Sequence, residues 1–166
     1  MTRPDAPDDL NARIGVLARR EVEARLLAPV LAAFAQEIGA ERARAILARA
    51  IEGIARAQGA ALAEQLGGND LADFVRSFSE WTKGGALEVE LSENSEGAFC
   101  FNVTRCRYAE MYEALGMREF GTMLSCARDL ALLEGFSQDL ILERTQTIME
   151  GAPYCDFAYR RKAAKT

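Results

Sequence analysis

Histidine is absent from this sequence of 166 residues. That absence excludes Ser-His-Asp and Cys-His catalytic sites, histidine-rich zinc sites and histidine-ligated haem. Any acid or base in a reaction must then be Asp, Glu, Cys, Tyr, Lys or water. The four cysteines, at positions 100, 106, 126 and 155, form no Cys-x-x-Cys pair, which excludes the usual redox motif and the zinc knuckle.

The chain also lacks an apolar run of the roughly 18 residues that span a bilayer, and its first residues lack the apolar stretch of a signal peptide. We therefore expect a cytoplasmic protein with reduced cysteines and no membrane partner. Positive charge is scarce as well, with 20 Lys and Arg against 25 Asp and Glu. Because phosphate binding needs clustered basic residues, we expect no nucleic-acid partner.

The length and composition fit a single domain over residues 1–166. Residues 1–12 are rich in Pro and Asp and predict a flexible lead-in. Residues 13–83 carry helical periodicity and residues 84–162 carry a mixed pattern, so we expect a helical part followed by an α+β part.

Apolar residues in the helical part recur at helical spacing from Ile14 to Ile38 and from Glu41 to Leu66. Pro29 predicts a kink or break in the first helix. Asp70 predicts the N-cap of a third helix that runs to about Trp81. The many alanines of the second helix permit close packing, and these N-terminal helices are the expected face for a homodimer.

The apolar period changes from 3.6 to 2 after residues 83–85, which predicts a strand hairpin there. In order, two strands, two helices and two more strands are predicted: residues 87–92, 99–104, 106–115, 118–133, 140–150 and 154–160. We therefore predict an α+β fold in which N-terminal helices pack with a C-terminal antiparallel sheet of two hairpins, with two intervening helices.

Cys106 lies where a predicted strand gives way to a helix, with Arg105 and Arg107 beside it in sequence. The positive end of the helix dipole and both arginines favour the thiolate, which is the nucleophilic form. The alternative is a small buried apolar side chain, because cysteine is among the most buried residue types. Cys126 and Cys155 are second candidates for a nucleophile, since sequence does not rank thiols by exposure.

Cys126 and Asp129 are three residues apart on a predicted helix and so share a face, where a carboxylate can orient water or accept a proton beside a thiol. Asp129 lies among apolar residues, so it either points to solvent or needs a buried partner. Arg144 suits that partner, because a guanidinium binds a carboxylate, of a side chain or of a substrate, through two hydrogen bonds. The alternative for Arg144 is a strand residue that faces water.

Cys155 shares one face of the last predicted strand with Phe157 and Tyr159, so we expect it to point inward. A zinc site made by the three thiols of Cys106, Cys126 and Cys155 with Asp129 is chemically conceivable, yet these residues lack the close spacing of zinc ligands. We predict no metal and no cofactor.

Three sequence blocks resemble the signature blocks of the L-2-amino-thiazoline-4-carboxylic acid hydrolase family: Asn102-Val-Thr-Arg-Cys-Arg-Tyr-Ala-Glu110, Ser125-Cys-Ala-Arg-Asp129 and Arg144-Thr-Gln-Thr-Ile-Met-Glu-Gly-Ala-Pro-Tyr-Cys-Asp-Phe157. They occur in this order, and the resemblance covers about residues 85–160. It implies a hydrolase that opens a small carboxylated C–N heterocycle, such as 2-amino-thiazoline-4-carboxylate, with water to give a carbamoyl-cysteine.

On this resemblance we assign roles to the residues of the three blocks. Cys106 attacks the ring carbon, Asp129 positions water or moves a proton, and Arg144 holds the carboxylate of the small-molecule substrate. The expected catalytic residues are Cys106, Asp129, Cys126 and Cys155. The expected substrate-binding residues are Arg144, Asn102, Thr145 and Tyr154. Tyr154 stands where the family commonly has His, and its higher reference pKa favours a hydrogen-bond donor over a base. The alternative is a non-catalytic small-ligand-binding or sensor module of the same fold.

Overall fold

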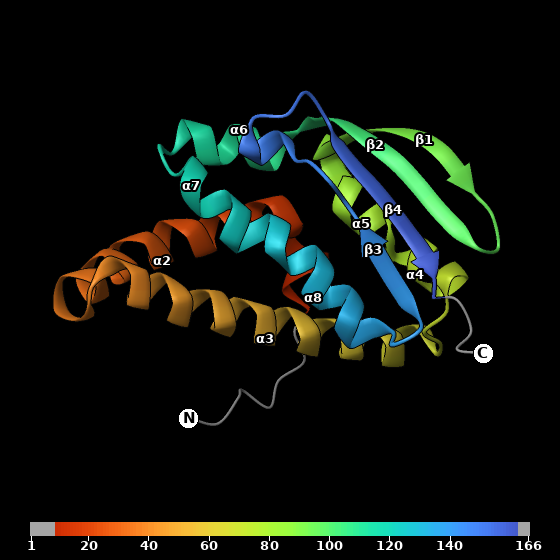
Figure 1. Cartoon of the computed structure of the whole chain (residues 1–166), viewed down its shortest axis with the longest axis horizontal. Coiled ribbons are helices and arrows are strands. Elements are labelled where there is room, and N and C mark those ends of the chain that lie inside the picture. The colour runs from red at the N-terminus through yellow and green to blue at the C-terminus, as the bar shows by residue number, and fades with distance from the viewer. Residues whose placement is uncertain (1–8, 163–166) are drawn as a thin grey trace.

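Helices cover one face of a four-stranded antiparallel sheet in the computed structural model, which describes residues 9–162 (Figure 1). The first half is helical: α1 Leu10–Ile14, α2 Val16–Ile38, α3 Ala40–Leu66, α4 Leu71–Ser77, α5 Ser79–Thr82 and the 3-10 turn η1 Lys83–Gly85. The second half is mixed: β1 Leu87–Asn94, β2 Ala98–Cys106, α6 Arg107–Ala114, α7 Arg118–Gly121, the π-helical segment η2 Thr122–Cys126, α8 Ala127–Phe136, β3 Leu140–Glu143, the 3-10 turn η3 Ile148–Glu150 and β4 Cys155–Arg161. The α+β fold predicted from the sequence is confirmed.

The sheet has the strand order β1-β2-β4-β3, and its central strands β2 and β4 supply the face that packs on the helices. The register pairs Phe99 with Tyr159 and Phe101 with Phe157, so aromatic side chains from both strands lie next to one another on this face. Phe74 of α4 contacts Tyr159 with ring centroids 4.8 Å apart. The alternation of apolar residues in these strands thus directs one aromatic layer toward the helices.

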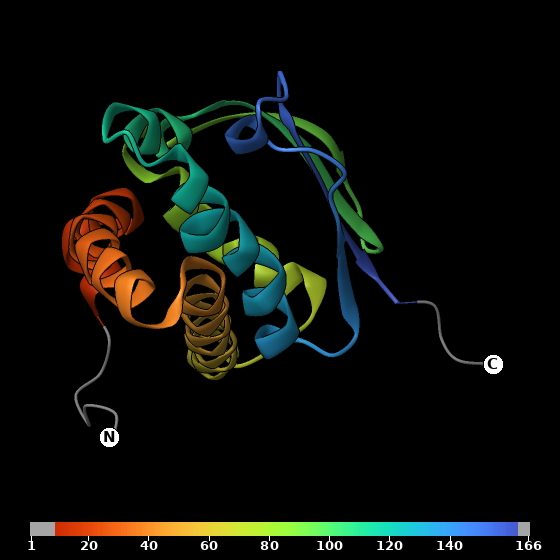
Figure 2. The same cartoon turned by 60° about the vertical axis from the view of Figure 1, so that its left-hand side comes forward.

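Helix α8 lies between α3 and the sheet (Figures 1 and 2). Gly59 of α3 and Gly135 of α8 allow this close approach. A Cβ on Gly59 would overlap the carbonyl oxygen of Leu132, and one on Gly135 would overlap the carbonyl oxygen of Arg56. Each helix therefore carries a glycine at the point where the backbone of the other presses against it.

The segment from Arg144 to Tyr154 departs from the sequence prediction, which continued one strand to Glu150. Strand β3 ends at Glu143, because the backbone amides beyond it bind side chains and not a neighbouring strand. The amides of Thr145 and Gln146 donate to the carboxylate of Asp156 at 3.0 and 2.8 Å. Local side-chain acceptors therefore end the strand, which period-2 patterning alone does not reveal.

The predicted helices also differ from the observed ones at their ends and at one interior point. Asp70 caps α4 as predicted, in a reciprocal pair of hydrogen bonds with Asp73, but the helix is interrupted at Phe78. Pro29 does not break α2, which continues from Val16 to Ile38. Residues 1–8 of the expected lead-in lie outside the described residues, and its last residues, from Leu10, belong to α1.

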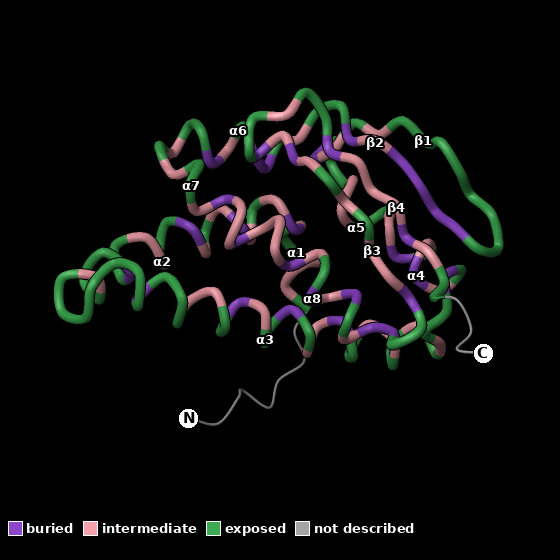
Figure 3. The backbone as a smooth tube through the Cα atoms, viewed as in Figure 1, coloured by how far each residue is buried: buried purple, intermediate pink, exposed green. Residues whose placement is uncertain are grey.

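A row of apolar residues along α2 is exposed to solvent (Figure 3). Its members are Val22, Leu26, Val30, Phe34 and Ile38. Phe34 is 58% exposed and Leu26 is 64% exposed. None of the helices within residues 9–162 is long and apolar enough to cross a membrane. The homodimer through the N-terminal helices stays a prediction. This exposed apolar row on α2 is the surface that we expect to form its interface.

We predict that Gly59→Ala and Gly135→Ala each lower the free energy of unfolding by at least about 2 kcal/mol, because the new methyl group must push two helix backbones apart. Gly53→Ala on the same helix α3 is the matched control, since nothing lies within 4 Å of its Cβ position. The control should stabilise the protein by about 0.5–1 kcal/mol through helix propensity. Urea unfolding measures all three, and equal effects at Gly53 and Gly59 would contradict the close-approach account.

We predict that the protein is a dimer by native mass measurement and that Phe34→Asp makes it a monomer, because a charge would then lie within the apolar row. Leu91→Asp is the control, since Leu91 is equally exposed at 58% but lies on β1. A monomeric parent protein at micromolar concentration would refute this prediction.

Candidate functional site

A cavity of about 110 Å³ lies between the inner face of the sheet and helices α2, α4, α5, α6 and α8. Such a volume holds several water molecules or a small ligand. Most of its wall is apolar or aromatic, with Phe74, Trp81 and Phe101 among the lining side chains. Five residues singled out from the sequence converge on it: Cys106, Cys126, Asp129, Arg144 and Cys155. The separate sequence blocks therefore meet at one place in the fold.

Asp129 of α8 and Arg144, just after β3, form an ion pair in the wall of this cavity. The Nη1 atom of Arg144 donates to Oδ2 of Asp129 at 2.6 Å, and its Nη2 donates to the carbonyl oxygen of Cys126 at 3.1 Å. The guanidinium also lies over the ring of Phe157, 5.1 Å from its centroid. The buried partner predicted for Asp129 is thus Arg144 itself.

Burial raises the pKa of the Asp129 carboxyl above its ordinary value, and the charge of Arg144 opposes that rise. Burial acts on Arg144 in the opposite direction, but the Asp129 carboxylate outweighs it, and the pKa of Arg144 is raised. The carboxylate of Asp129 therefore lies in a largely apolar cavity, and it binds a proton more tightly than an exposed aspartate does.

Cys106 is the last residue of β2 and directly precedes α6, as the sequence predicted. Burial raises the pKa of its thiol to about 11, although the backbone amides of Ala109 and Tyr108 act to lower it. The prediction that Arg105 and Arg107 lower the pKa of the Cys106 thiol is wrong. Arg105 binds Glu88 and Glu110 on the surface, and Arg107 donates to the carbonyl of Gly84. The effect of desolvation on the pKa of Cys106 is therefore larger than the opposite effect of the helix N-terminus.

The other two cavity thiols are neutral for the same reason. Burial raises the pKa of Cys126, and the nearby charge of Asp129 raises it further. Burial also raises the pKa of Cys155, whose Sγ accepts a hydrogen bond from the backbone amide of Ile148 at 3.2 Å. Cys155 is buried, and it lines the cavity together with Phe157 and Tyr159 of the same strand face, which confirms the inward orientation predicted for it.

Three of the expected substrate-binding residues do not line the cavity: Asn102, Thr145 and Tyr154. Thr145 donates through its amide and its hydroxyl to Asp156 at 3.0 and 2.6 Å, and so holds the chain after β3 against β4. Asn102 pairs with Asp156 across the two strands. Tyr154 is 39% exposed in the turn that precedes β4. These residues shape the outer side of the segment that carries Arg144.

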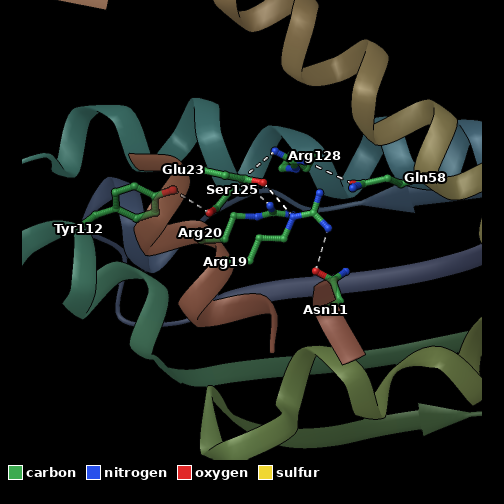
Figure 4. Close-up of polar contacts among 8 residues, drawn as sticks. All are labelled: Asn11, Arg19, Arg20, Glu23, Gln58, Tyr112, Ser125 and Arg128. Atoms are coloured by element: carbon green, nitrogen blue, oxygen red, sulfur yellow. Dashed lines mark hydrogen bonds and ion pairs between the residues drawn. The ribbon is translucent and has the colours of Figure 1, made fainter. Parts of the chain in front are cut away.

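Two arginines that the sequence analysis did not single out also line the cavity, Arg20 of α2 and Arg128 of α8. Both are buried and lie around the carboxylate of Glu23 (Figure 4). A signal was present, because Arg20 falls four residues after Val16 and four before Ala24, on the buried stripe of α2. Charge at a buried helical position is a reason to suspect a site.

The zinc site conceived from three thiols and Asp129 has no support. Within the part of the chain that the structure describes, no three His, Cys, Asp or Glu side chains are placed so that they could hold a metal ion. The four cysteines are free thiols. The chemistry available at the cavity is that of neutral thiols, the half-buried carboxylate of Asp129 and three guanidinium groups.

We predict that alkylation of Cys106 by iodoacetamide rises about tenfold per pH unit from pH 7 to 9 and has no plateau in that range, because only the thiolate reacts and its pKa is about 11. The alkylation rate rises with pH because the pKa lies above this range, and each unit of pH below 11 removes about nine tenths of the remaining thiolate. Peptide mapping measures the rate at each cysteine. A plateau near neutral pH would show instead an activated thiolate.

Comparisons with known proteins identify one family and one similar fold. No curated protein matches the chain. A similar solved structure is the crystal structure of a trafficking protein particle complex subunit 3 from Naegleria fowleri covalently bound to palmitic acid, with a TM-score of 0.50 and 8% identity. The match covers 88% of this chain and 96% of that one, and at this identity it shows the fold alone. The family model of L-2-amino-thiazoline-4-carboxylic acid hydrolase matches residues 19–159, so the chain belongs to that family.

Proposed function

We propose that this protein is a hydrolase that opens a small carboxylated C–N heterocycle, such as 2-amino-thiazoline-4-carboxylate, in the cavity beneath the sheet. The observation that carries the proposal is the convergence of Cys106, Cys126, Cys155 and the Asp129–Arg144 pair on one cavity. These residues come from all three blocks that resemble the family, and the family model spans them. A shared cavity is what a shared chemical task requires.

Asp129 is the best placed general base for such a reaction. Its pKa is raised by burial, which makes its carboxylate a stronger proton acceptor, while Arg144 fixes its orientation through the 2.6 Å hydrogen bond. In the proposed step the oxygen of a water molecule bonds to the C=N carbon of the ring as Asp129 takes one water proton. The π electron pair of the C=N bond moves to the ring nitrogen, which takes that proton from Asp129. A single bond from this carbon to a ring heteroatom then breaks with its electron pair on the leaving atom, Asp129 transfers the hydroxyl proton to that atom, and the carbamoyl C=O is formed.

The cavity thiols have a different role in this scheme from the one expected from the sequence. With a pKa of about 11, the Cys106 thiol is almost entirely protonated at neutral pH and is a poor nucleophile. A neutral thiol is a weak hydrogen-bond donor and a compact apolar group, so it can shape the wall beside the ring. We therefore place water, activated by Asp129, ahead of Cys106 as the attacking group.

The second candidate function is binding of a small ligand without turnover. The apolar wall and the raised pKa values of three thiols favour it, because a catalytic nucleophile needs the opposite electrostatics. The fold neighbour is described as covalently bound to palmitic acid, so this fold accommodates an apolar acid in at least that protein. Stabilisation by a ligand in a thermal-shift assay, with no product formed, would favour this second function.

We predict that Asp129→Asn lowers turnover of 2-amino-thiazoline-4-carboxylate at least about 100-fold, because the amide cannot take a proton from water. Cys106→Ala should keep turnover within about threefold if water attacks the ring carbon. Chromatographic detection of the carbamoyl-cysteine product measures both.

Cys100→Ala is the matched control for the cysteine variant, since Cys100 lies outside the cavity wall and its Sγ is 3.8 Å from Oε2 of Glu93. Circular dichroism checks that Asp129→Asn is folded. Loss of activity in Cys106→Ala, with Cys100→Ala active, would replace the water route by covalent attack from Cys106. Full activity in Asp129→Asn would remove Asp129 from the mechanism.

A further inference from the structure

The buried arginines Arg20 and Arg128 are short of negative charge. Their exposed fractions are 7% and 4%, and both line the cavity. The same carboxylate, that of Glu23, accepts hydrogen bonds from Arg20 at 2.6 Å, from Arg19 at 2.9 Å and from Arg128 at 3.5 Å (Figure 4). The two buried guanidinium groups, those of Arg20 and Arg128, thus share one carboxylate, which leaves this buried pair with an excess of positive charge.

Arg128 is the least satisfied member of this cluster. Its Nη2 donates to the neutral amide oxygen of Gln58 at 3.3 Å, while its Nε has no hydrogen-bond partner although it is buried. Burial, aided by the neighbouring charge of Arg20, lowers the pKa of Arg128 to about 10. A buried N–H without an acceptor costs free energy that a bound acceptor would recover.

We propose that Arg128, assisted by Arg20, binds the carboxylate of the ligand in this cavity. A carboxylate offers the acceptor that Nε lacks and the negative charge that the cluster lacks, and it suits the two-pronged geometry of a guanidinium. The apolar part of the ligand then lies along the aromatic wall. This inference rests on the proposed function only in that both take the ligand to be carboxylated.

Arg144, to which the sequence analysis gave this role, is already engaged. It donates to the Asp129 carboxylate and to the carbonyl of Cys126, and it is stacked over Phe157. Binding a ligand carboxylate there would place a second anion beside Asp129 with one guanidinium between them. Arg128 and Asp129 are consecutive residues of α8 and both line the cavity, so the anion site and the proposed base belong to one wall.

The test is the ¹H–¹⁵N NMR signal of the Arg128 Nε–H, which reports on the unpartnered donor itself and is assigned by its loss in Arg128→Lys. The probes are 2-amino-thiazoline-4-carboxylate, benzoate and hexanoate, each compared with a counterpart that has no carboxylate: 2-aminothiazoline, benzyl alcohol and hexanol. We expect at least one carboxylate, and no counterpart without one, to shift this signal to lower field as a hydrogen bond forms. No shift with any of the three carboxylates, or a shift of the Arg144 signal alone, would overturn the proposal.

Arg128→Met supplies a second measurement, because Met fills similar volume without charge. We expect affinity for the responding carboxylate to fall about 10- to 100-fold while affinity for its counterpart without a carboxylate is unchanged. The melting temperature should not fall, because the variant removes an unmatched buried charge. A melting temperature that falls while affinity for the carboxylate is unchanged would assign Arg128 a structural role and overturn the proposal.

Arg56→Met is the matched control, since Arg56 is exposed on α3, pairs with Glu134 and lies outside the cavity wall. Product analysis on the same samples separates the two proposals. Carboxylate binding at Arg128 without turnover leaves this inference standing and removes the proposed reaction. Turnover with an unmoved Arg128 signal removes this inference and leaves the reaction.

Discussion

The backbone contact between α3 and α8 sets the geometry on which the cavity depends. Because Gly59 and Gly135 carry no Cβ, α8 lies directly against α3 and, on its other side, beside the sheet. That position turns residues of α8 toward the inner face of β2 and β4. Larger residues at either glycine would force the two backbones apart, and the walls of the cavity would move with them. A contact between two helix backbones thus helps to place the reactive groups of α8.

The cavity combines an apolar wall with charges of both signs, and α8 supplies one charge of each sign. Asp129 faces Arg144, whereas Arg128, the residue before it, faces the Glu23 cluster. Burying charge is costly unless each group finds a partner, and the two clusters differ in this respect. The Asp129–Arg144 pair is matched within the chain. The arginine cluster is not, and its unsatisfied Nε leaves a place for an acceptor from outside the chain.

Most of the fold and about half of the candidate site could be predicted from the sequence. Strands β1, β2 and β4 were predictable from the alternation in their sequences, although the structure buries both faces of the first half of β2 and no residue of β1 fully. The end of β3 was not, because it depends on hydrogen bonds to Asp156, a residue on another strand. The cavity residues of the three blocks were found through their clustering and the family resemblance. Arg20 and Arg128 were missed because an arginine in a helix is normally solvated, and only tertiary packing places these two inside.

The acidity of Cys106 shows how burial can reverse a deduction that is correct for an isolated helix. The helix end and the two flanking arginines would lower the pKa of an exposed thiol, but Arg105 and Arg107 are turned to surface partners and the thiol is enclosed. The loss of water then outweighs the remaining backbone amides. The same loss of water raises the proton affinity of Asp129. One physical effect therefore weakens the thiol as a nucleophile and strengthens the carboxylate as a base, which is why the cavity suits activation of water better than covalent attack by cysteine.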